Sequence, residues 1–230
     1  LLKIILILFI ISGNLYAEDF EFTSSQLNIL QDGDLMTGSG DVNIISADEI
    51  IKANKFEYNK INSHLKLIGN VSIVNKTNNT IISGNRVDYF KDEEKLIIDG
   101  NVKANIENKY SINSENIIYL KEKEYFFSKN KTIFNDKNGN KFQLDNFDYY
   151  KLNERIRGKN LIFTDSELNE YFIDDAMVKL DTNEILGKDI KMNFVSSTFG
   201  NSKNEPRLKG NKIFINEKTT KISKGIFTTC

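Results

Sequence analysis

A short pattern recurs along this chain at intervals of 29 to 31 residues, and it constrains the fold more than any other feature. Each copy begins with a small or apolar residue and has apolar side chains three and five positions later. Five clear copies begin at Ser24, Ala53, Gly84, Ser114 and Leu144, and looser copies begin at Gly158, Gly187 and Gly210. A fixed period of this length is typical of proteins that stack one supersecondary unit on the next.

The second half of each unit contains a glycine followed by a polar residue and a valine, as in "DGNVKA". Gly40, Gly69 and Gly100 each lie 16 residues after the start of their copy. Apolar residues stand two apart on both sides of these glycines, which places them on one face of a pleated strand. A glycine within a strand marks a bulge or a bend, so we expect the strands to bend at Gly69 and Gly100. No segment after residue 17 keeps a helical period, so we expect almost no helix.

The first 17 residues, "LLKIILILFIISGNLYA", are typical of a secretory signal. Lys3 supplies a positive charge, and the apolar run from Ile4 to Ile11 is shorter than the ~20 residues that span a bilayer. We expect cleavage after Ala17, which divides the chain into a signal, 1–17, and a β domain, 18–230. The alternatives are a buried N-terminal strand and an uncleaved anchor.

Composition excludes several functions. Lys and Arg number 31 against 32 Asp and Glu, and the charges are interspersed, so we expect no nucleic-acid partner. His64 is the only histidine, and we expect it to be solvated in a polar turn. The sequence contains no Cys/His cluster for zinc, no glycine-rich phosphate loop and no Ser/His/Asp set. We therefore expect no enzymatic activity, no catalytic residue, no cofactor and no metal.

The repeated small-residue, apolar, tyrosine unit, the "GNVSI" and "DGNV" strands and the export signal together resemble the OstA-like domain family. That domain is shared by the periplasmic lipopolysaccharide-transport protein LptA and the N-terminal part of the outer-membrane protein LptD. The resemblance runs from about Phe20 to Cys230 and is best from Ser24 to Ala104. It implies an all-β fold, an open twisted β-jellyroll (β-taco) of repeated antiparallel strands. It also implies lipopolysaccharide transport and assembly at the periplasmic face of the outer membrane, with lipid A acyl chains in an apolar groove.

Two features resemble the LptD branch: the length of the domain and its ending, "KGIFTTC", at residues 224–230. Cys230, the only cysteine, is either a free thiol or half of a disulfide. The resemblance implies a disulfide to cysteines near an outer-membrane barrel that is absent from this sequence. It further implies an LptE-like lipoprotein partner if that barrel exists. Strands around Phe20 to Ile29 would pair edge to edge with an LptA-like bridge protein. The alternatives are a free-standing LptA-like bridge and a structural β-solenoid or adhesin repeat that binds no lipid.

The residues expected to line the lipid groove share one strand parity across successive repeats. They lie before and after the glycine of each unit and at the apolar and tyrosine positions of its first half. The predicted lining comprises Leu27, Ile29, Val42, Ile44, Phe56, Tyr58, Leu67, Val71, Ile73, Val87, Tyr89, Leu96, Ile98, Val102, Ile117, Tyr119, Phe147 and Tyr149.

Overall fold

The structure is a computed structural model that describes residues 20–229 except 78, 183, 197, 199, 201, 202, 204 and 217. In this part of the chain, eighteen antiparallel strands form one continuous sheet. The predictions of an all-β antiparallel fold and of almost no helix are confirmed, since the described helices are four three-residue 3-10 turns. The predicted cleavage after Ala17 and the predicted disulfide of Cys230 lie outside the described residues. None of the described helices is long and apolar enough to cross a membrane.

The strands are β1 (Glu21–Thr23), β2 (Gln26–Leu30), β3 (Leu35–Ile45), β4 (Glu49–Asn59), β5 (His64–Asn75), β6 (Thr80–Phe90), β7 (Lys95–Ile106), β8 (Tyr110–Leu120), β9 (Tyr125–Ser128), β10 (Thr132–Asp136), β11 (Lys141–Leu144), β12 (Asn146–Tyr150), β13 (Arg155–Thr164), β14 (Glu170–Lys179), β15 (Glu184–Asn193), β16 (Arg207–Ile215), β17 (Thr220–Ser223) and β18 (Ile226–Thr228). The 3-10 turns are η1 (Gln31–Gly33), η2 (Lys91–Glu93), η3 (Lys121–Lys123) and η4 (Lys151–Asn153).

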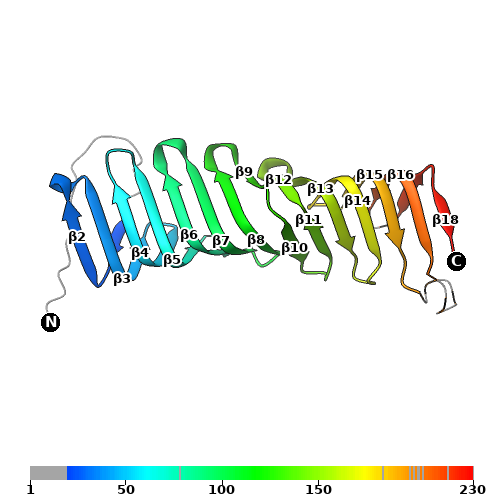
Figure 1. Cartoon of the computed structure of the whole chain (residues 1–230), viewed down its shortest axis with the longest axis horizontal. Helices are drawn as coiled ribbons and strands as arrows, with labels where there is room; N and C mark the ends of the chain where they lie inside the picture. Colours follow the sequence, from blue (N-terminus) through cyan, green and yellow to red (C-terminus); the bar gives the residue numbers. More distant parts are fainter. Residues whose placement is uncertain are drawn as a thin grey trace.

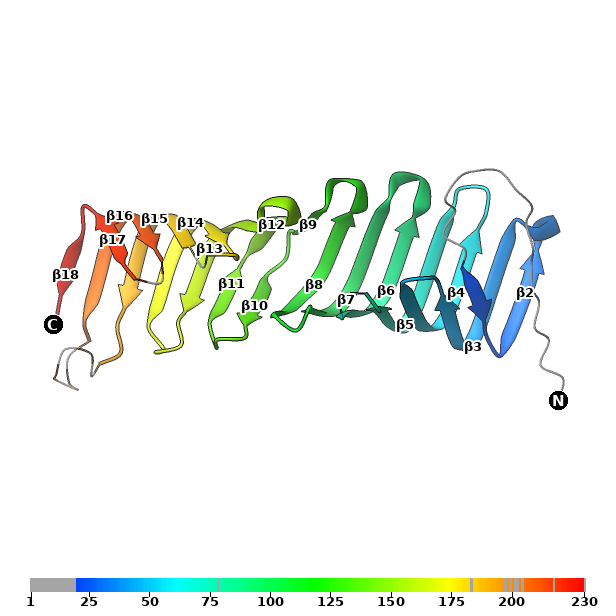
Figure 2. The same cartoon turned by 180° about the vertical axis from the view of Figure 1, so that it is seen from behind.

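The strands lie side by side in sequence order along the long axis of the molecule (Figure 1). The opposite view shows the N-terminal and C-terminal strands at the two ends of this row (Figure 2). Four pairs of short strands each take the place of one long strand. For example, β8 pairs with β9 through 118–120 and with β10 through 110–114. The described chain is therefore a meander of units of similar length. Each long strand bends near its middle, and the bends line up along the long axis of the molecule.

The bend occurs where the sequence predicted it. Gly69 and Gly100 have φ of 78° and 77°, and Asn70 and Asn101 after them have φ of 49° and 52°. The strand registers slip at the same points, which identifies a bulge in each strand. A Cβ atom on Gly100 would lie 2.8 Å from the Nδ2 atom of Asn85, so the bend has no room for a side chain. The prediction that the strands bend at these glycines is confirmed.

The line of bends, here called the spine, divides the sheet into two arms. The first arm contains 26–39, 55–68, 86–99, 116–128, 146–158, 176–187 and 212–223, apart from positions 183 and 217. The second arm contains 21–23, 42–53, 71–84, 102–114, 132–144, 161–173, 190–210 and 226–228, apart from the undescribed positions. The tip of the first arm repeats at the predicted period. Glu94, Glu124 and Glu154 all have φ near 45°, and each backbone N–H donates to the carbonyl oxygen three residues earlier at 3.0–3.1 Å.

The core lies between the two arms. Phe22 of the second arm packs on Phe56 of the first, with ring centroids 5.1 Å apart. Farther along the row, Phe134 of the second arm meets the edge of Phe147 of the first at 5.0 Å. A single cluster of buried apolar residues extends from β3 to β16. The sheet therefore folds over on itself and buries one of its faces, here called the inner face.

Candidate functional site

The inner face is organised as rows of side chains that cross the strands. Neighbours in a row are direct cross-strand partners, because an antiparallel register places such partners on the same face. The row in the middle of the first arm begins with Leu27, Gly38, Phe56, Leu67, Val87, Ile98 and Ile117. It continues through Ser128, Phe147, Gly158, Ala176, Gly187, Ile213 and Ile222.

A second row lies nearer the tip of the first arm, at the mouth between the arms. It includes Tyr58, Tyr89, Tyr119, Phe126 and Tyr149. The rings of Tyr119 and Phe126 stack with centroids 4.0 Å apart, and Phe126 is 5.9 Å from Tyr149. Burial raises the pKa of Tyr149 to about 12, so its hydroxyl stays neutral at physiological pH. The mouth thus has a band of uncharged aromatic rings, with the carboxylates of Glu107, Glu124 and Glu154 near Tyr149.

The predicted lining residues fall into three groups. Eleven are buried between the arms, with exposed fractions of 0–8%: Val42, Ile44, Phe56, Leu67, Val71, Ile73, Val87, Ile98, Val102, Ile117 and Phe147. Five are partly buried at the mouth: Tyr58, Tyr89, Leu96, Tyr119 and Tyr149. Leu27 and Ile29 are 42% and 53% exposed, because β2 is the terminal strand and its described pairing is with β3 alone. These residues lie on the inner face, and the prediction that they line a lipid groove stays a prediction.

The second arm contributes an aromatic wall that the sequence analysis missed. One row of that arm includes Phe134, Phe142, Phe163, Tyr171 and Met192. Their side chains are 4–7% exposed. The signal for them was the two-residue alternation in "TIFND", "KFQLD" and "NLIFT". Phe163 and Met192 belong to the looser copies that begin at Gly158 and Gly187, but these copies lack the second glycine of the earlier units, so the predicted lining did not include them.

A hydrogen bond between distant parts of the chain joins the two arms at the mouth. Tyr110 begins β8 at the tip of the second arm, and Leu180 follows β14 at the tip of the first. The Tyr110 hydroxyl donates to the carbonyl oxygen of Leu180 at 3.3 Å. Burial and the nearby carboxylate of Glu154 raise the pKa of Tyr110, which keeps its hydroxyl a donor. This contact, here called the mouth bond, holds the arms together near the centre of the molecule.

A hydroxyl cluster interrupts the apolar inner face at β8 to β10. Ser114 and Thr132 are 2.9 Å apart, and Ser128 donates to the side-chain oxygen of Asn116 at 2.8 Å. All three hydroxyl residues are at most 8% exposed. No buried side-chain N or O atom in the described part of the chain lacks a hydrogen-bond partner. The cluster is therefore satisfied internally and needs no ligand.

The outer face carries a charged cluster that corrects the expectation for His64. This residue begins β5 rather than lying in a turn, and its ring stacks on Phe90 at 4.4 Å. Its Nε2 atom is 2.9 Å from Asp88, which Arg86 also contacts at 2.5 Å. Burial opposes ionisation of Asp88, but the hydrogen bonds from Arg86 and His64 outweigh it and lower the pKa of the carboxyl. The cluster is a satisfied network with no adjacent nucleophile.

Among the described residues, no group of three or more His, Cys, Asp or Glu side chains could hold a metal ion. The inner face offers apolar surface, ring faces and hydroxyls, and no charged side chain of the described residues is buried in it. Such a surface can pack against hydrocarbon.

Some solved structures resemble part of this molecule, while comparisons of the sequence find no match. No family model matches the sequence, and no curated protein is similar to it. A crystal structure of LptH from Pseudomonas aeruginosa resembles part of the molecule. LptH is described as the LptA-homologous periplasmic component of the lipopolysaccharide transport device. The TM-score is 0.43 at 14% sequence identity, over 47% of this chain and 80% of LptH. The strand pairings of this chain, and not this likeness, define its fold.

Proposed function

We propose that this chain transports lipopolysaccharide across the periplasm by holding lipid A acyl chains between its two arms. The observation that carries the proposal is the inner face, which presents apolar rows along nearly the whole described chain without a buried charge. A ligand that moves along such rows would meet similar apolar surfaces at successive repeats, apart from the hydroxyl cluster at β8 to β10. No single deep site would retain it.

The free energy of lipid entry depends on which contacts between the arms the acyl chains replace. Each methylene group buried in an apolar setting contributes about 0.8 kcal/mol. The arms would have to separate, which breaks ring contacts such as Phe22–Phe56 and Phe134–Phe147. Acyl chains would then pack against the same side chains, so apolar contact is exchanged rather than lost. The spine, where bulges already bend the strands, is the hinge for that separation.

The ends of the sheet are the proposed contacts with other transport proteins. The described pairings of β2 and β18 are each with a single strand, β3 and β16 respectively. Leu27, Ile29, Ile226 and Phe227 are 42–72% exposed at these ends. Unpaired strand edges recruit further strands, so an LptA-like bridge protein would extend the sheet at β2. If proline at Leu27 left that association unchanged, the docking site would be elsewhere.

The finer assignment rests on the length of the domain and on the resemblance of residues 224–230 to the LptD branch. We infer that the chain is the periplasmic domain of an LptD-like protein at the outer membrane. Cys230 would then form a disulfide with a cysteine near the barrel, and an LptE-like lipoprotein would bind that barrel. A free-standing LptA-like bridge requires neither partner. Sequencing the gene beyond the codon for Cys230 separates the two, because only the first is followed by several hundred codons of alternating strands.

Photo-crosslinking tests the conduit with a pair of adjacent residues. Leu96 faces the mouth on the inner face, and Ile97 is the next residue on the outer face. Both are half-buried, so a benzophenone amino acid fits either position with similar disruption. In cells that supply the transport partners, lipopolysaccharide should crosslink at position 96 and not at position 97. Equal crosslinking at both positions, or none at either in folded protein, would overturn the proposal.

A structural β-solenoid is the second candidate, and the tight closure of the interior favours it. Ile44, Leu67, Ile98 and Leu161 are at most 1% exposed. A solenoid needs a filled core of this kind and no lipid. In that case the protein would fold and persist at the cell surface, and position 96 would crosslink to no lipid.

A further inference from the structure

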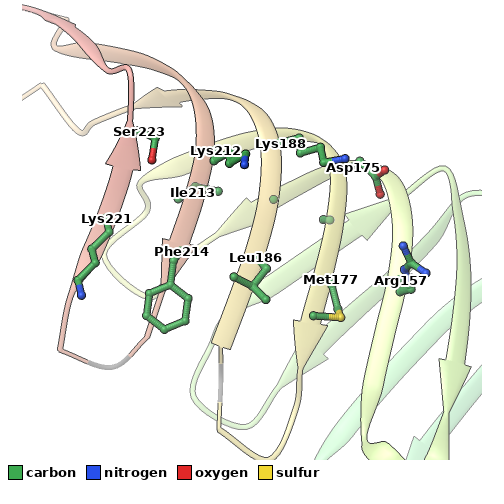
Figure 3. Close-up of a pocket in the computed structure, with 12 residues that line it drawn as sticks. Arg157, Asp175, Met177, Leu186, Lys188, Lys212, Ile213, Phe214, Lys221 and Ser223 are labelled. Atoms are coloured by element: carbon green, nitrogen blue, oxygen red, sulfur yellow. The ribbon is translucent and has the colours of Figure 1, made fainter.

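A hollow of about 470 Å³ lies on the outer face of the first arm, between β13 and β17 (Figure 3). Its apolar lining comprises Met177, Leu186 and Phe214, here called the floor, together with the alternate residues Ala176, Gly187 and Ile213, of which Ala176 and Ile213 are at most 3% exposed. The hollow is therefore separated from the core by the thickness of one sheet. Its volume lies within the range of about 300–1,000 Å³ that is usual for small-molecule sites.

The apolar floor belongs to a cross-strand row with a cation at each end. In spatial order the row is Arg157, Met177, Leu186, Phe214 and Lys221, each the register partner of the next. Leu186 is 42% exposed. Three adjacent apolar side chains on the solvent face of a sheet are unusual, because polar side chains normally cover that face. The row can therefore bury the hydrocarbon part of a ligand.

The neighbouring row places two cations directly opposite each other. It contains Asp175, Lys188, Lys212 and Ser223, and Lys188 is the register partner of Lys212. Like charges in this arrangement destabilise a sheet unless an anion lies between them. Asp175 is engaged by the Nζ atom of Lys159 at 3.0 Å. Within the described part of the chain, Lys188 and Lys212 form no ion pair.

The charge balance of the hollow differs from that of the whole molecule. Its walls carry four cations, Arg157, Lys188, Lys212 and Lys221, against the single carboxylate of Asp175. The whole chain has a formal net charge of -1. The hydrogen bond from Lys159 lowers the pKa of Asp175, and the positive charges of Lys188 and Arg157 act in the same direction. A positive field of this kind favours an anion.

We propose that this hollow binds one molecule of an anionic amphiphile. A phosphate or carboxylate head group would lie between Lys188 and Lys212, and the first part of an acyl chain would cover Met177, Leu186 and Phe214. A free inorganic anion would leave the apolar floor uncovered. The site is on the face opposite the proposed conduit, so either proposal can fail without the other.

Methionine methyl groups provide a direct test, because the chain has three and they divide between the two faces. Met177 lies in the hollow, whereas Met36 and Met192 face the interior. With ¹³C-methyl methionine, titration of monododecyl phosphate below its critical micelle concentration should shift the Met177 signal first. Laurate should give the same shift, which separates a general anion requirement from a phosphate requirement. Shifts confined to Met36 and Met192 would contradict the outer site and would support the conduit instead.

Matched lysine variants test the head-group contact. Lys188→Gln with Lys212→Gln should weaken binding of monododecyl phosphate by about tenfold or more, since charge-assisted contacts to the anion are lost. Lys191→Gln with Lys209→Gln is the control, because these lysines are also register partners on β15 and β16 but belong to the second arm. The control should change affinity by less than about twofold. Equal losses in the two double variants would overturn the assignment of the head group.

The role of the apolar floor is tested by changing the ligand, because a substitution in the floor could cause the protein to misfold. Inorganic phosphate and uncharged dodecyl maltoside should each bind at least about tenfold more weakly than monododecyl phosphate, because each lacks one half of the contact. Dodecyl maltoside affinity equal to that of monododecyl phosphate would refute the role of the lysines. Sedimentation with anionic vesicles, in the absence of any monomer-induced shift at Met177, would replace the single-molecule site with a membrane contact.

Discussion

Gly100→Ala should destabilise the protein by more than the same substitution at an uncrowded glycine. Gly100 has φ of 77°, and a Cβ there would meet the Asn85 side chain at 2.8–3.1 Å. Gly139, in the turn between β10 and β11, has φ of 87° and no heavy atom within 4 Å of the added Cβ. The left-handed backbone costs alanine about 1–2 kcal/mol at either position. Crowding at the spine adds about 1–3 kcal/mol at Gly100 alone.

The comparison of the two variants isolates the crowding at the bend. Both substitutions remove the same freedom from the unfolded chain, so that contribution cancels. Urea unfolding followed by circular dichroism at 218 nm measures the free energy of unfolding. The Gly100→Ala midpoint should be lower than that of Gly139→Ala by about 1 M, given a slope of about 1–3 kcal/mol/M. Equal midpoints would mean that the spine has room for a side chain and that the bend does not depend on the glycine.

Two further variants probe the mouth and the outer charged cluster. Tyr110→Phe removes the mouth bond, worth about 0.5–1.5 kcal/mol, so lipopolysaccharide crosslinking at Leu96 should become faster. Tyr58→Phe is its control, because among the described residues that hydroxyl has no hydrogen-bond partner, and equal rates in the two variants would exclude a role for the mouth bond. Asp88→Asn should lower the free energy of unfolding at pH 7 by about 1–2 kcal/mol. The pKa of Asp88 is lowered in the folded protein, so its contribution is complete above the ordinary carboxyl pKa and is lost as pH falls through the folded value. Unfolding titrations from pH 7 to pH 2 should therefore show a smaller acid-dependent loss in Asp88→Asn than in the wild-type chain.

The first half of the fold was predictable because strand parity and glycine spacing agree there. Alternation around Gly69 and Gly100 predicted both the buried face and the position of the bend. Beyond Gly100 the bend no longer needs glycine. Asn160 and Asp189 have φ of 51° and 53°, and asparagine and aspartate tolerate this region better than other residues with side chains. A search for glycine therefore could not locate the spine in the later strands.

The closure of the interior and the outer hollow were not predictable from the pattern. Alternation shows which side chains share a face, but it does not show whether the opposite arm covers them. The contact between Phe134 and Phe147 depends on how far the spine bends. Similarly, Met177, Leu186 and Phe214 stand at the alternate positions of their strands, which face outward and are usually polar, so the two-residue pattern predicts no role for them. Their significance appears only when the register places them side by side.

The hydroxyl cluster at Ser114, Ser128 and Thr132 bears on how lipid could pass the centre of the molecule. The cluster lies where the glycine spacing ends, and it separates two longer apolar stretches of the inner face. An unsatisfied polar group there would oppose hydrocarbon by about 1–3 kcal/mol. These hydroxyls instead donate to one another and to Asn116, so an acyl chain can lie against them without breaking a hydrogen bond. A static core gains little from three hydroxyls at its centre, where aliphatic side chains would pack as well. For the proposed conduit, the cluster is a short stretch with weaker hydrocarbon affinity between two apolar stretches, and because its hydroxyls are already satisfied it would oppose the passage of an acyl chain only slightly.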